Sequence, residues 1–135
     1  MVTITGEYQG DLHCSAVHGP SGTALATDAP KDNQGRGESF SPTDLVATAF
    51  ATCIATTMAI VGRKHGVEIG NVRYEVTKEM TTEGPRKIAR LRAKLWMPTA
   101  SKAVPEGVLE KAAKSCPVHK SLAADVEKVI ELIWE

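Results

Sequence analysis

The chain has 135 residues, with 16 Lys and Arg residues balanced by 16 Asp and Glu residues and 42% hydrophobic residues. Proteins that bind nucleic acids or anionic membranes usually carry a basic excess or a basic patch. The neutral charge balance of this chain therefore argues against both kinds of partner. The length predicts a single domain over residues 1–135. With only two Phe, two Tyr and two Trp residues, such a chain is expected to complete its core against a second copy of itself.

The predicted elements begin with strands. Residues 2–9 and 11–18 predict a β-hairpin that turns at 9–11, and residues 23–28 predict a third strand. The segment 29–40 is rich in Gly and polar residues and predicts a loop. The start, Met1 to Glu7, has neither the basic nor the apolar region of a signal peptide, so we expect a cytoplasmic protein whose cysteines stay reduced.

The strongest local signal is a helix start at Ser41. Ser41 occupies the N-cap position, Pro42 the first helical position and Asp44 the third, a capping-box variant with Asp in place of Glu. The helix is expected to run to about Lys64 and to end at His65–Gly66. Its uncharged stretch, residues 45–62, contains several Thr and Ala residues, so we expect a buried helix and not a membrane span.

The second half predicts a strand at 68–80, a turn at 82–85 and a strand at 86–97, in which basic and apolar residues alternate. A connector at 98–105 follows, then a helix at 106–115, a short helix at 117–124 and a final strand at 126–134. Strands grouped around helices, without strict alternation of strand and helix, indicate the α+β class.

Three cysteines could carry chemistry: Cys14, Cys53 and Cys116. From its position alone, Cys53 in the middle of a helix is better explained as a small buried residue. Cys116 precedes Pro117 at a helix end and is expected to be exposed to a loop, with His119 on the same side if the short helix forms. Spacing cannot pair two thiols, because a disulfide depends on the distance between them in the fold.

Two segments resemble the OsmC/Ohr family, the osmotically inducible and organic hydroperoxide resistance proteins. Residues 41–53 (SPTDLVATAFATC) are similar to the helix that carries the family's first Cys, and residues 116–122 (CPVHKSL) to the segment that holds its second. The preceding 35–40 (GRGESF) fits the OsmC-like branch. The resemblance implies one OsmC-like α+β domain, in which antiparallel sheets surround a long central helix carrying Cys53, completed by intertwined dimerisation.

The resemblance also implies a peroxiredoxin-like activity in oxidative-stress defence. The Cys53 thiolate would attack an organic hydroperoxide, or hydrogen peroxide less well, and become a sulfenic acid. Cys116 would then form a disulfide with Cys53, which an external dithiol of the lipoyl type would reopen. Neither a metal nor an organic cofactor is expected.

The sequence departs from the family in the residues that would activate the thiol. The hydroperoxide-resistance branch carries a Glu where this chain has Thr43, paired with an Arg from the N-terminal strands, and residues 1–35 here contain no Arg. Arg36 and Glu38 are therefore auxiliary candidates from the loop, and His119 is a candidate cation or proton donor. Asp44 is interpreted as a capping residue.

Two alternatives stay open. The missing Arg–Glu pair favours a non-enzymatic OsmC-like protein that binds a small ligand in a thiol-lined interface cleft. A metal site of Cys53, Cys116 and His119, with His13 or Cys14 as fourth ligand, has half of a zinc-like spacing but no second paired motif. Cys14 is otherwise interpreted as a packing residue.

Overall fold

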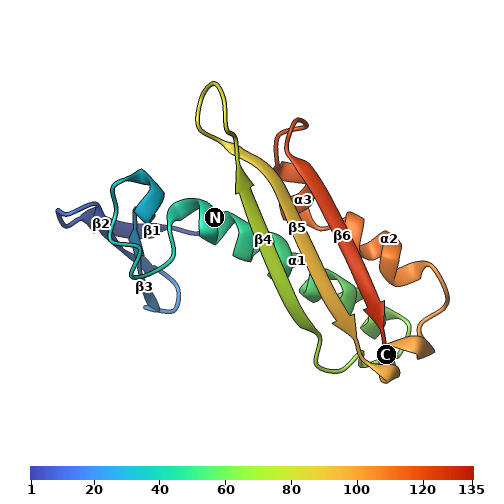
Figure 1. The fold of residues 1–135 in the computed structure, drawn as a ribbon. Coiled ribbons are helices and arrows are strands. Elements are labelled where there is room, and N and C mark those ends of the chain that lie inside the picture. Colours follow the sequence, from blue (N-terminus) through green and yellow to red (C-terminus); the bar gives the residue numbers. More distant parts are fainter. The chain divides into compact units, whose positions relative to one another are not determined.

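The computed structural model describes residues 1–135 in two compact units, residues 1–46 and residues 47–135. Figure 1 shows the strands and helices of each unit. The single domain over residues 1–135 stays a prediction.

The N-terminal unit is a three-stranded antiparallel sheet in the order β1 (Ile4–Tyr8), β2 (His13–His18) and β3 (Ala24–Asp28). These strands confirm the three predicted at residues 2–28, each slightly shorter than expected. The first turn is tight, with positive φ at Gly10, Asp11 and Leu12. The predicted loop after β3 contains one short 3-10 helix, η1 (Lys31–Asn33).

The N-terminal unit buries no apolar side chain. Its buried residues are Asp28 and Ser41, which are 2% and 1% exposed. The register pairs Tyr8 with Cys14 and Ala16 with Leu25, so these residues share a face with Ile4. Ile4, Tyr8 and Leu25 are all exposed on that face. A sheet of this size gains little hydrophobic stabilisation until its apolar face is covered.

Helix α1 (Pro42–Lys64) follows the predicted boundaries and the predicted cap. The Asp44 N–H donates to Ser41 Oγ over 3.1 Å, and the Ser41 N–H donates to Asp44 Oδ2 over 2.9 Å. These reciprocal bonds satisfy donors that the first helical turn leaves without a partner. At the other end Gly66 adopts a φ of 74°, and the Val67 N–H donates to the Gly62 carbonyl over 2.9 Å. This left-handed residue ends the helix as predicted.

The C-terminal unit contains a sheet in the order β4 (Arg73–Met80), β5 (Ile88–Met97) and β6 (Glu127–Trp134). β4 and β5 are antiparallel, whereas β5 and β6 are parallel, so the sheet is mixed and the expectation of purely antiparallel sheets is wrong in this detail. The parallel pair follows from the long connection, which carries η2 (Thr99–Ala103), α2 (Val108–Lys114) and α3 (Pro117–Ser121) across from one end of β5 to the start of β6.

The core of this unit lies between the sheet and α1, which passes behind the sheet in Figure 1. Leu91, Ala93, Leu95 and Met97 alternate along β5 and are fully buried. Phe50, Ile54 and Met58 recur along one face of α1 and are also fully buried. The spacing of two in the strand and of four in the helix is what places both sets on inward faces. This packing holds α1, and Cys53 with it, against a fixed sheet.

Helix α1 is long and apolar enough to cross a membrane by length and composition, a test that core helices of other proteins also pass. Only 33% of its most apolar window is buried, and Ile60 is 51% exposed. The helix therefore has a packed face and an uncovered, uncharged face.

Candidate active site

Cys53 lies about three turns into α1, at the border between its packed and uncovered faces. The residue is half-buried, while its neighbour Ile54 is fully buried. The Cys53 Sγ atom lies 3.9 Å from the Thr57 hydroxyl oxygen, one helical turn further along. Cys53 is thus reachable from solvent, unlike the fully packed thiol that its mid-helix position alone would favour.

Cys116 is the N-cap of α3, and its side chain is fully buried. The expectation that it is exposed to a loop is wrong, because Cys116–Pro117 begins a new helix that folds back on the core. The His119 N–H donates to Cys116 Sγ over 3.2 Å. Burial raises the pKa of the Cys116 thiol, the His119 amide opposes this, and the hydrogen bond with the Cys53 thiol raises it further.

The structure therefore brings the two predicted thiols together. The Cys53 thiol contributes to the raised pKa of Cys116, which makes the two side chains neighbours although they come from α1 and from the α2–α3 junction. Burial raises the pKa of Cys116, so this thiol stays protonated near neutral pH. The pair thus combines a half-buried thiol, Cys53, with a fully buried one, Cys116.

A cavity of about 410 Å³ opens beside Cys53. Its walls come from the uncovered face of α1 and the start of α3, and they are mainly methyl and methylene groups. The lining residues are Ala49, Thr52, Cys53, Thr56, Thr57, Ile60, Pro117 and Val118. No charged residue lines it, so the cavity suits an apolar ligand.

His119 is close to this site, as predicted, but it is not the expected cation. Its ring stacks on Phe50 of α1, with ring centroids 6.1 Å apart. Burial lowers the pKa of His119, and the positive charges of Lys128, Lys114 and Lys120 lower it further. The imidazole is therefore mainly neutral near pH 7 and serves the site as a packing group between α3 and α1.

Arg36 and Glu38 belong to the N-terminal unit, where they gather around Asp28. Arg36 Nη2 lies 3.6 Å from Asp28 Oδ1, and His13 Nδ1 lies 2.7 Å from the same oxygen. The hydrogen bond from His13 lowers the pKa of Asp28, and Arg36 and the Glu38 backbone lower it further. Sequence reasoning missed Asp28 and considered His13 only as a possible metal ligand. Only the register of β2 against β3, which pairs His13 with Asp28, could have revealed them.

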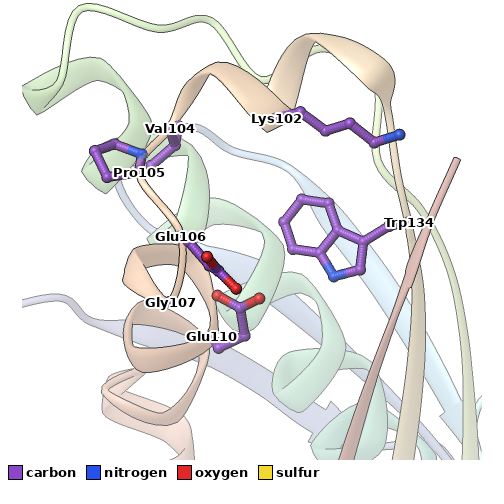
Figure 2. Close-up of a pocket in the computed structure, with 7 residues that line it drawn as sticks. All are labelled: Lys102, Val104, Pro105, Glu106, Gly107, Glu110 and Trp134. Carbon is purple, nitrogen blue, oxygen red and sulfur yellow. The ribbon is translucent and has the colours of Figure 1, made fainter.

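A second cavity, of about 280 Å³, lies between the η2–α2 segment and the end of β6. Figure 2 shows the carboxylates of Glu106 and Glu110 turned toward each other near the ring of Trp134. No cysteine or histidine lines this cavity. The structure holds no group of three or more His, Cys, Asp or Glu residues that could bind a metal ion, and thus offers the zinc-like alternative no support.

The sequence matches one known protein family over most of its length. The family model described as OsmC-like protein matches residues 35–131, more than two thirds of the chain and including both thiol segments. The chain belongs to the OsmC-like family. A search of curated proteins returned no match.

Solved structures of the OsmC-like family agree with this fold. A Psychrobacter arcticus protein, named for osmotic stress induction and detoxification response, is 36% identical to this chain. The match covers 98% of this chain and 96% of the Psychrobacter protein, with a TM-score of 0.85. An OsmC-like protein from Mycoplasma pneumoniae is 16% identical over 99% and 96% of the two chains, with a TM-score of 0.78. An organic hydroperoxide resistance protein from Legionella pneumophila is 14% identical over 98% and 96%, with a TM-score of 0.73. The last two show a shared fold alone.

Proposed function

We propose that this protein is a cysteine-based peroxidase that reduces organic hydroperoxides, and hydrogen peroxide less well, in defence against oxidative stress. The observation that supports the proposal is that a half-buried Cys53 neighbours a fully buried Cys116, whose pKa is raised by burial and by the Cys53 thiol. A peroxidase of this kind needs an accessible attacking thiolate and a protected thiol that can resolve its oxidised form. Membership of the OsmC-like family supports the same activity.

The reaction balances in two steps. The Cys53 thiolate attacks the terminal oxygen of the peroxide, the O–O bond breaks, and the alcohol leaves with a proton taken from solvent, so that Cys53 becomes a sulfenic acid. The Cys116 thiol then forms an S–S bond with Cys53 and water leaves. An external dithiol, of the lipoyl type, reduces the disulfide by exchange and is itself oxidised to a disulfide.

The uncharged cavity beside Cys53 supports a preference for apolar peroxides. Its volume of about 410 Å³ holds more than hydrogen peroxide needs, and its wall of Ala49, Ile60 and Val118 offers dispersion contacts to an alkyl or aryl group. We therefore expect aryl and alkyl hydroperoxides to react with a lower KM than hydrogen peroxide.

We further propose that the protein acts as a homodimer. The N-terminal sheet exposes Ile4, Tyr8 and Leu25 on one face and buries no apolar side chain. The uncovered face of α1 exposes Ile60 beside the candidate site. A second copy of the chain could cover these surfaces, and burial of their apolar area would favour association. The cytoplasmic location and the roles of Arg36 and Glu38 in activating the thiol remain predictions.

The decisive experiment treats the reduced protein with one equivalent of cumene hydroperoxide and counts free thiols. Wild type and Cys14→Ser should each lose two thiols per chain, and Cys116→Ser should accumulate a sulfenic acid on Cys53 that dimedone traps and intact mass detects. Survival of both thiols in the folded protein would refute the proposal and favour the alternative, a non-enzymatic ligand-binding protein. Turnover with dihydrolipoamide, compared with glutathione at equal thiol concentration, tests the class of reductant.

A further inference from the structure

The Thr57 hydroxyl lies beside the Cys53 sulfur and has no role in the two reaction steps described above. Thr57 is half-buried, lines the same cavity as Cys53, and places its Oγ1 atom 3.9 Å from Cys53 Sγ. The two residues are four apart on α1, a spacing that puts their side chains on the same face of the helix. The contact therefore follows from the rigid helix and does not depend on a loop.

Thr52, another threonine of the cavity wall, is arranged differently. The Thr52 hydroxyl donates to the carbonyl of Thr48 over 2.8 Å and lies 3.3 Å from the carbonyl of Ala49. Such bonding back to the helix backbone occupies the proton of the hydroxyl group. The Thr57 hydroxyl is instead directed at sulfur, so its proton is available to a thiolate.

We propose that Thr57 is a catalytic residue whose hydroxyl donates a hydrogen bond to the Cys53 thiolate and stabilises it for attack. This inference rests on the proposed peroxidase function. The residues that line the cavity include no Arg, Lys or Glu, and His119 is mainly neutral, so a hydroxyl is the donor that the cavity wall itself offers. Hydrogen bonds to charged acceptors are stronger than bonds between neutral groups, which makes a hydroxyl adequate for this task.

The same hydroxyl serves the next step of the reaction. When the thiolate attacks, its negative charge moves to the departing alkoxide, and the sulfur becomes neutral as the sulfenic acid forms. The Thr57 oxygen carries a lone pair that can accept the sulfenic O–H. No oxidant beyond the peroxide and no further cofactor is needed.

The test measures Cys53 reactivity directly, in a Cys14→Ser/Cys116→Ser background in which Cys53 is the only thiol. The rate at which iodoacetamide carbamidomethylates Cys53 is recorded from pH 5 to pH 10 for this parent protein and for its Thr57→Val and Thr57→Ser variants. Valine keeps the shape and removes the hydroxyl. Loss of one hydrogen bond to the thiolate should move the Thr57→Val profile to higher pH and slow its reaction at pH 7 about tenfold. Thr57→Ser, which retains the hydroxyl, should stay within about twofold of the parent.

Thr52→Val is the matched control, because it removes a hydroxyl from the same wall whose proton is bonded to the backbone. Its alkylation profile should coincide with that of the parent. If Thr57→Val and Thr52→Val give the same profile, the inference is wrong. If Thr57→Val does not fold, judged by circular dichroism, Thr57→Ala replaces it with the same expectation.

The alkylation result is independent of peroxide turnover. A protein that does not reduce cumene hydroperoxide, but whose alkylation depends on the Thr57 hydroxyl, would refute the peroxidase proposal and keep the role of Thr57 as thiolate donor. With turnover, kcat/KM for cumene hydroperoxide at low peroxide should fall about tenfold in Thr57→Val with both native thiols present. An unchanged kcat/KM in that variant would remove Thr57 from the reaction.

Discussion

The backbone N–H of His119 donates to the Sγ atom of Cys116 over 3.2 Å, so the candidate resolving thiol is also the N-cap of helix α3. A disulfide to Cys53 would redirect that sulfur and weaken its role as an acceptor. The His119 ring, which stacks on Phe50, is carried by the same short helix. We therefore expect oxidation of the thiol pair to affect the order of α3.

We predict that disulfide formation loosens α3. Hydrogen exchange of the His119 amide should be faster in the oxidised than in the reduced protein, since an N-cap contributes about 1 kcal/mol to helix stability. Cys116→Ser retains a capping oxygen and should keep the slow exchange, whereas Cys116→Ala should lose it. Equal His119 exchange in the oxidised and reduced proteins would contradict the coupling.

The two thiols should differ in their reaction with a small alkylating reagent. Cys53 faces a cavity, whereas Cys116 is fully buried and its pKa is raised by burial. In Cys14→Ser protein at pH 8, iodoacetamide should modify Cys53 at least about tenfold faster than Cys116. Peptide mass mapping over time measures both rates, and unfolding in urea should bring them together. Faster modification of Cys116 in the folded protein would reverse the assigned roles.

The neutral His119 predicts a dependence of stability on pH. Burial lowers the pKa of His119 in the folded protein, so below about pH 6.5 the unfolded chain binds a proton that the folded chain resists. His119 therefore does not lower the free energy of unfolding above that pH. As the pH falls toward the pKa of His119 in the folded protein, the free energy of unfolding decreases. Urea titrations between pH 5 and pH 8 should show a shallower decline in His119→Gln than in wild type. Identical declines would show that His119 is not responsible.

The exposed apolar face of the N-terminal sheet predicts self-association. Ile4 and Tyr8 are 65% and 64% exposed and share one face of β1, whereas Thr5 lies on the other. Light scattering after gel filtration should give a dimer for wild type. Ile4→Asp/Tyr8→Asp should shift the protein to monomer or lower its melting temperature by several degrees, because each charge opposes burial of that face. Thr5→Asp is the control and should remain dimeric. A monomeric wild type would overturn the dimer proposal.

The sequence by itself determined the local elements and singled out the candidate site residues. Ser41, Pro42 and Asp44 specify a helix start through bonds within one turn, and the structure repeats that cap. The pattern of apolar residues likewise located every strand, because the side-chain period of a strand is local information. The two segments around Cys53 and Cys116 identified the family, which the family model confirms.

Tertiary structure alone decided the surroundings of those residues. The parallel pairing of β5 and β6, the burial of Cys116 and its contact with Cys53 depend on how a long crossover connection packs, and no local pattern encodes that. The same holds for His13 beside Asp28, which needs the strand register. The desolvation that keeps His119 neutral and Cys116 protonated is a property of packing. The sequence therefore specifies the residue types of the candidate site, and the fold specifies the distances between them and their burial.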